Sequence, residues 1–158
     1  MNTVLHTYLT AEQSDSGYFP EKVKPNIDVA FKSIEVKNSD GVNCSEFVCE
    51  DKIFIYFALV IKNKDHQNSL FVIIKDKYGT PVFSSENKIN KSEMTLVIHE
   101  KFLTRGNYSL HSFIHIPKVA QFDVADDVCH FMISDTSSPM VIHGNFEYGN
   151  VFGNTTWQ

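Results

Sequence analysis

Apolar and polar residues alternate along most of this chain, and the alternation predicts strands rather than helices. In residues 53–61 every second side chain is large and apolar, which is the period of a strand with one face in a core. No segment keeps a period of 3.6 residues over three turns, so we expect little helix. Short apolar runs separated by turn residues predict seven or eight strands, among them residues 29–36, 53–61, 70–74, 80–84, 94–98, 108–116 and 128–133.

Residues 70–87 are predicted to form a hairpin around which the other strands are arranged. Leu70–Ile74 is an unbroken apolar run, and the turn sequence Asp76–Gly79 follows it. Pro81 has no backbone N–H to donate, so the second strand of the hairpin belongs at a sheet edge. In the first predicted strand the alternation slips near Lys32–Ser33, which indicates a bulge.

Together these elements predict an all-β fold, an antiparallel β-sandwich of seven to eight strands over residues 27–158. Residues 1–26 lack periodicity and contain Pro20 and Pro25 among polar residues, so we expect a linker or tail there. A length of 158 residues fits one domain with a sizeable core.

The charge pattern argues against several kinds of partner. The net charge is -5 and basic residues do not cluster, which disfavours nucleic acid or an anionic membrane as the main partner. The longest apolar run, residues 53–61, is too short to span a bilayer, and residues 1–6 do not resemble an export signal. We therefore expect a cytoplasmic protein with three reduced cysteines, because a Cys44–Cys49 bridge would need an oxidising compartment.

Sequence motifs for catalysis or cofactor binding are absent. There is no phosphate-binding loop, dinucleotide-binding glycine motif, serine-hydrolase elbow or zinc-protease motif. His111 and His115 would lie ~13 Å apart on one strand, too far to share a metal ion. Asp126–Asp127 could suggest paired acids, but it is interpreted as the solvated start of a loop that precedes the strand at residues 128–133. We expect no enzyme, cofactor or metal; the alternative is a glycan-modifying enzyme, whose converging carboxylates one sequence cannot reveal.

Side-chain parity places aromatic and basic residues on the outer faces of three predicted strands. The large apolar residues of strands 53–61 and 108–116 should face the core, which turns the intervening side chains outward. In the hairpin strand Lys75 must reach solvent, so Phe71 shares its outer face. The candidate binding residues are Phe54, Tyr56, Phe71, Lys75, His111, Phe113 and His115.

Two interpretations of these outer residues stay open. Aromatic rings commonly lie under sugars, while imidazoles and lysines donate hydrogen bonds to hydroxyls or to an anionic cap such as a phosphate or an acidic sugar. Alternatively, another strand, a dimer partner or residues 1–26 cover these side chains, and no ligand binds there. A large exposed aromatic patch needs a partner under either interpretation.

Four segments, taken in order, resemble one known family. They are residues 28–36 with the Asp40–Gly41 turn, residues 72–83 with the pattern D-x-x-G-x-x-V-F, residues 103–110 with the pattern L-x-x-G-x-Y-x-L, and residues 128–133 followed by residues 149–151 and Trp157. In order and spacing they are similar to the C-terminal carbohydrate-binding domain of the ATP-binding subunit of O-antigen polysaccharide ABC transporters (Wzt-type). The similarity extends over about residues 28–158.

This resemblance implies an immunoglobulin-like sandwich that recognises the capped non-reducing end of an O-polysaccharide and couples chain termination to export. The implied partners are the ATP-binding domain and membrane subunit of the transporter, at the inner face of the inner membrane. A homodimer is also implied, in which the C-terminal strand, here roughly residues 140–158, can be exchanged. The alternative is a structural or dimerisation module without its own ligand.

This sequence departs from the family pattern because it shows no ATP-binding domain, so we expect either a domain excised from a longer protein or a separately encoded module. Residues 1–26 would then be the remnant of a linker to that domain. Because the family has no invariant ligand-binding motif, no binding residue can be carried over from it, and the candidate residues rest on side-chain parity alone.

Overall fold

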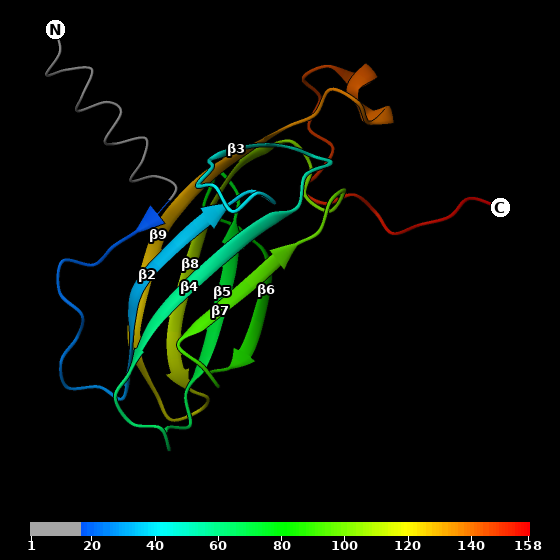
Figure 1. The fold of residues 1–158 in the computed structure, drawn as a ribbon. Helices are drawn as coiled ribbons and strands as arrows, with labels where there is room; N and C mark the ends of the chain where they lie inside the picture. Colours follow the sequence, from blue (N-terminus) through cyan, green and yellow to red (C-terminus); the bar gives the residue numbers. More distant parts are fainter. Residues whose placement is uncertain (1–16) are drawn as a thin grey trace, which may run out of the picture.

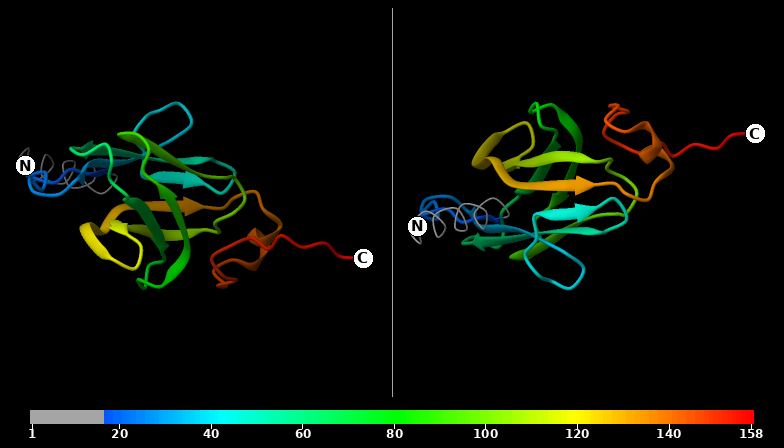
Figure 2. Two further views of the ribbon diagram at one scale, coloured as in Figure 1. Left: turned by 90° about the horizontal axis from the view of Figure 1, so that it is seen from below. Right: turned by 90° about the horizontal axis from the view of Figure 1, so that it is seen from above.

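Two β-sheets packed face to face build the structure, a computed structural model that describes residues 17–158 (Figures 1 and 2). The four-stranded sheet has the order β1-β2-β4-β7, and the five-stranded sheet has the order β3-β9-β8-β5-β6. The strands are β1 (Gly17–Tyr18), β2 (Val29–Lys37), β3 (Glu46–Val48), β4 (Ile53–Ile61), β5 (Ser69–Lys75), β6 (Pro81–Lys88), β7 (Glu93–Ile98), β8 (Gly106–Ile116) and β9 (Ala120–Ser134).

This architecture confirms the predicted immunoglobulin-like β-sandwich. Neighbouring strands pair antiparallel, except that the short β3 runs parallel to β9. The strand that begins at Pro81 lies at a sheet edge, as its missing N–H requires. The predicted bulge in the first long strand is present as a register shift between Phe31 and Ser33.

The core lies between the two sheets and follows the predicted parity. From β4, Ile53, Ile55, Phe57 and Leu59 are buried, while Tyr108, Leu110 and Ile114 fill the space from β8. Burial of one such side chain stabilises the fold by roughly 1.5–3 kcal/mol. Because strand residues alternate, the same burial fixes which side chains point away from the core.

The last long strand begins earlier than the sequence indicated, which corrects the interpretation of Asp126–Asp127 as a loop before that strand. β9 already runs from Ala120, and the two aspartates lie within it at a bulge. Asp127 and Cys129 both have left-handed backbone angles, with φ of 51° and 56°. Such bulges break the alternation of apolar and polar residues, and this hid the strand in the sequence.

Part of the segment expected to be a linker takes part in the fold. Gly17 and Tyr18 pair with β2, and the Tyr18 ring meets the edge of Phe31 with 6.3 Å between ring centroids. Further along, Lys24 lies 3.7 Å from the buried carboxylate of Asp123 on β9. The remainder of that expectation, residues 1–16, falls outside the described residues.

The C-terminal segment folds back across one end of the sandwich. After β9 it forms the 3-10 turn η1 (Pro139–His143), and Asn150–Phe152 then pairs with residues 102–104. The remaining residues project away from the sheets in every view (Figures 1 and 2), and Trp157 is 97% exposed. Within residues 17–158 no helix has the length and apolar character needed to cross a membrane.

The three cysteines are unbonded, and two of them are buried. Burial raises the pKa of Cys129 to about 12, so its thiol stays protonated and unreactive at neutral pH. Cys49 also has a raised pKa, first because of burial and then because it donates a hydrogen bond to Asp135. These thiols therefore act as small core groups rather than as nucleophiles.

Candidate functional site

The seven candidate residues form two surfaces rather than one. Phe54 and Tyr56 lie on the outer side of β4, in the four-stranded sheet. The other five lie on the outer side of the five-stranded sheet, which we call the β5–β8 face: Phe71, Lys75, His111, Phe113 and His115. Parity indicates which side of its own strand a residue occupies, but it does not say which sheet the strand joins. The two sets therefore cannot contact one small ligand together.

Aromatic side chains form a continuous cluster on the β5–β8 face. Phe71 and Phe113 are cross-strand neighbours, and their rings stack with centroids 4.9 Å apart and planes at 9°. His115 meets Phe113 edge to face at 4.9 Å, and His111 lies 5.8 Å from the same ring. Because the two phenylalanine faces cover each other, this cluster offers ring edges and imidazoles to the outside, and the stack itself stabilises the sheet.

Each basic group of the β5–β8 face already has a carboxylate partner. His115 Nε2 makes a short contact with Glu86, and His111 Nδ1 lies 2.7 Å from Asp126. Lys75 Nζ lies 4.0 Å from the same aspartate. The hydrogen bond from His111 is the main reason why the pKa of Asp126 is lowered. Because each of these groups already contacts a carboxylate, they suit neutral hydroxyls better than an anionic cap, and each imidazole keeps one further ring nitrogen for hydrogen bonding.

Sequence reasoning missed both carboxylates of this face. Asp126 reaches His111 because the β9 bulge redirects it, and no pattern in the sequence marks that turn of the backbone. Glu86 stands opposite Phe71 in the hairpin register. Counting the register back from the Asp76–Gly79 turn would have placed Ser85 opposite Phe71 instead, because the pairing shifts by one residue between Ile74 and Lys75.

The aromatic residues of the opposite sheet are less available. The ammonium group of Lys37 lies over the Tyr56 ring, 4.8 Å from its centroid, and Lys37 is also the cross-strand neighbour of Phe54. A cation in that position covers one face of the tyrosine ring. Tyr56 is 37% exposed and Phe54 is half-buried, so β4 offers a small aromatic surface.

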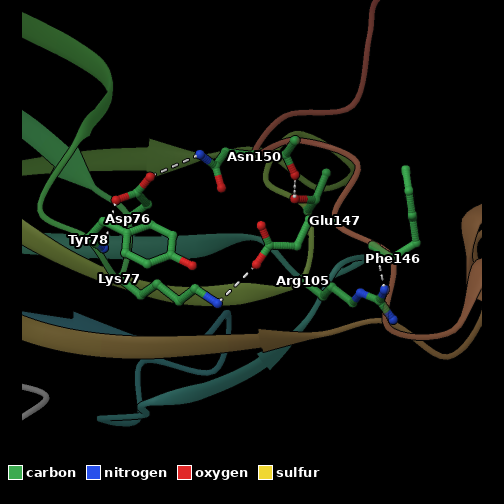
Figure 3. Close-up of polar contacts among 9 residues, drawn as sticks. Asp76, Lys77, Tyr78, Arg105, Phe146, Glu147 and Asn150 are labelled. Atoms are coloured by element: carbon green, nitrogen blue, oxygen red, sulfur yellow. Dashed lines mark hydrogen bonds and ion pairs between the residues drawn. The ribbon is translucent and has the colours of Figure 1, made fainter.

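A second candidate site, the end cleft, opens beside the C-terminal segment (Figure 3). It has a volume of about 580 Å³ and lies between the β5–β6 turn, the start of β8 and residues 145–150. Lys77 Nζ is 3.1 Å from Glu147, and the Asn150 amide donates to Asp76 over 3.3 Å. These contacts hold the C-terminal segment as one wall of the cleft.

Local sequence explains the opposite wall. The Asp76 carboxylate accepts hydrogen bonds from the backbone N–H groups of Tyr78 and Thr80, at 2.9 and 3.0 Å. Gly79 has a φ of 78°, which favours glycine. The turn therefore holds Lys77 and Tyr78 outward, and Tyr78 is 72% exposed. The turn was predicted; the cleft was not, because its second wall comes from about 70 residues further along the chain.

The Asp135 carboxylate anchors the C-terminal wall. It accepts hydrogen bonds from Ser137 N, Ser138 N and the Ser138 hydroxyl, as well as from Cys49 and Tyr148. Burial alone would raise the pKa of Asp135, but the bonds from Ser138, Cys49 and Ser137 outweigh it and lower the pKa to about 2. The carboxylate is therefore charged at neutral pH and holds the segment after β9 against the sandwich.

Comparisons with known proteins were made on sequence and on structure. No sequence among curated proteins matches the chain. Among solved structures, the crystal structure of the C-terminal domain of Wzt superposes with a TM-score of 0.61 at 11% identity, covering 89% of this chain and 90% of that one. A β-glucuronidase from Parabacteroides merdae gives a TM-score of 0.46 at 13% identity, covering 67% of this chain and 14% of that one.

Although these pairwise identities are low, the sequence matches a model of a protein family over most of its length. The family model for the Wzt C-terminal domain matches residues 26–147, which include all seven candidate residues and most of the sandwich. The superposition with a solved Wzt C-terminal domain supports the same fold. The chain belongs to the Wzt C-terminal domain family.

Proposed function

We propose that this domain binds the capped non-reducing end of an O-antigen polysaccharide and thereby couples chain termination to export by an ABC transporter. Membership of the Wzt C-terminal domain family supports a role as a carbohydrate-binding module of a transporter. In this proposal the domain works beside the ATP-binding domain and the membrane subunit, at the cytoplasmic face of the inner membrane.

The observation that carries the proposal is the convergence of five candidate residues on the β5–β8 face of a domain of this family. Ring edges of Phe71 and Phe113 would contact the apolar side of a sugar, and His111 and His115 would hydrogen-bond its hydroxyls. Their side chains are 20% and 16% exposed, so their positions are fixed before a ligand arrives. Each such bond adds roughly 1 kcal/mol net, which gives a modest affinity.

Binding without catalysis fits the electrostatics of this face. A glycosidase needs a carboxyl group whose pKa is raised so that it can act as an acid. The carboxylates here are held by histidines, and the pKa of Asp126 is lowered instead. We therefore propose that the polymer is bound intact.

A homodimer with exchange of the C-terminal strand, roughly residues 140–158, is part of the same proposal. The last residues project from the sandwich, and Trp157 and Ile142 are 97% and 86% exposed. Large apolar side chains exposed to this degree are typical of a surface that meets a partner. A second copy of the chain would cover them.

Single substitutions on the two sheets test the β5–β8 face. We expect His111→Ala to weaken binding of the capped O-polysaccharide about fivefold and Phe113→Ala about tenfold, measured by isothermal titration calorimetry. Tyr56→Ala is the matched control, because it removes an exposed ring from the opposite sheet and should leave the affinity unchanged. Circular dichroism confirms folding, and size-exclusion chromatography reports the oligomeric state.

A different pattern of results would favour the structural alternative. If His111→Ala and Phe113→Ala kept full affinity while the dimer dissociated, the β5–β8 face would be a subunit interface and the proposed site would be wrong. Phe113→Ala also removes the stack with Phe71, so His111→Ala gives the cleaner result.

A further inference from the structure

The end cleft combines exposed aromatic rings with polar groups outside the β5–β8 face. Tyr78 and Phe146 are 72% and 69% exposed, and Tyr148 and Asn107 line the same hollow. A volume of about 580 Å³ is in the range of sites for small molecules. Rings beside amide groups are the combination that binds the apolar and hydroxyl-bearing sides of a sugar.

Arg105 brings to the cleft a positive charge that makes no salt bridge with a carboxylate of the described residues. One guanidinium nitrogen donates to the backbone carbonyl of Phe146 over 2.9 Å (Figure 3), and the group lies 5.0 Å from the centroid of the Tyr148 ring. Neither partner carries a formal negative charge. Among residues 17–158, no carboxylate lies within 4.0 Å of this guanidinium. A planar group with five donors and one used bond is well suited to an anion.

The carboxylates of the cleft are each occupied by other partners. Asp76 is held by its own turn and by Asn150, Asp135 by the segment after β9, and Glu147 by Lys77. These three carboxylates nevertheless lower the electrostatic potential that Arg105 produces in the cleft. Glu147 in particular neutralises Lys77, which would otherwise stand beside an incoming anion.

We propose that the end cleft is a second saccharide subsite that takes an acidic sugar unit, with Arg105 holding its carboxylate or phosphate and Tyr78 and Tyr148 contacting the ring. This inference rests on the proposed glycan-binding function for its biological role. In this proposal the β5–β8 face binds the neutral hydroxyls of the glycan, and the end cleft binds its acidic group. The C-terminal segment forms one wall, so binding there also stabilises residues 145–150.

Acidic and neutral monosaccharides test this subsite directly. The probes are D-glucuronic acid and D-mannose 6-phosphate, compared with D-glucose and D-mannose, and binding is followed by amide chemical shifts in NMR titrations. We expect an acidic probe to perturb residues 76–78, 105–107 and 145–150, and the neutral probes to perturb them much less. The carboxylate and phosphate arms show which anion the cleft prefers.

Three variants test whether binding of the acidic probe depends on the charges of the end cleft. Arg105→Gln should weaken binding of the acidic probe about tenfold, whereas Glu147→Gln should strengthen it about threefold because it releases Lys77. Lys64→Gln is the matched control, since Lys64 is exposed in the loop before β5, at the other end of that strand from the cleft. It removes the same charge and should change nothing.

The subsite is wrong if neither acidic probe perturbs the cleft, if neutral sugars perturb it equally, or if Arg105→Gln binds as well as the wild type. Binding of the capped polysaccharide despite such a result would leave the proposed function standing. Conversely, perturbation of the cleft by an acidic sugar in a protein that ignores the polysaccharide would contradict the proposed function and keep the subsite.

Discussion

Leu110→Ala should lower the free energy of unfolding by about 2–5 kcal/mol. Leu110 is fully buried on β8, the strand that lies between β9 and β5 in the five-stranded sheet. The change removes buried methyl groups and leaves a cavity between two close-packed sheets. Urea denaturation followed by circular dichroism measures the loss.

The neighbouring residue provides the control for this prediction. His111 is next on the same strand but points away from the core, so His111→Ala should change the stability by less than about 1 kcal/mol. For binding we expect the reverse order. Leu110→Ala, where it is folded, keeps the β5–β8 face and its affinity, whereas His111→Ala weakens binding. Equal stability of the two variants would mean that the parity of β8, and with it the β5–β8 face, is wrong.

Asp135→Ala should release the C-terminal wall of the end cleft. The carboxylate is the common acceptor for the serines after β9 and for Tyr148, so its removal leaves several donors without a partner. Losing such charge-assisted bonds typically costs about 1–3 kcal/mol. Hydrogen exchange of residues 137–150 should become much faster, while exchange in β4 and β8 should stay slow. Asp135→Asn, which keeps one carbonyl acceptor, should show a smaller effect.

The same carboxylate predicts a response to acid. Its pKa is about 2 in the folded domain, below the ordinary value of 3.8, so the stabilisation that it provides is complete above about pH 4. It is lost as the pH falls through the range between those two values. Protection of the wild-type amides in residues 137–150, relative to the intrinsic exchange rate at each pH, should therefore fall at low pH toward that of Asp135→Ala. A pH-independent difference between the two proteins would contradict this role.

The alternation of apolar and polar residues was sufficient to predict those strands that have one buried and one exposed face. Ile55 and Phe57 mark the buried side of β4 without help from any other part of the chain, because a strand with one buried face must alternate. Pro81 likewise assigned its strand to a sheet edge. The β9 strand was shortened in the prediction because Asp123, Asp127 and the bulge interrupt the pattern, although Asp123 is buried and accepts a hydrogen bond from Phe31 N.

The functional surfaces depend on contacts that local patterns do not contain. Tyr56 and Phe113 have the same parity signal, yet they lie on opposite sheets because strand order is a property of the whole fold. The end cleft joins Lys77 to Glu147, and Asp135 to Tyr148, through a segment with no periodic pattern at all. Sequence therefore identified side chains that point outward, and the fold decided which of them meet.

Calorimetric titration of the domain with the O-polysaccharide of its host, with and without the terminal cap, tests the central proposal most directly. The capped polymer should bind at least about tenfold more tightly than the uncapped one, the equivalent of one or two hydrogen bonds to the cap. Equal affinity for both polymers, or no binding of either, would contradict recognition of the chain end.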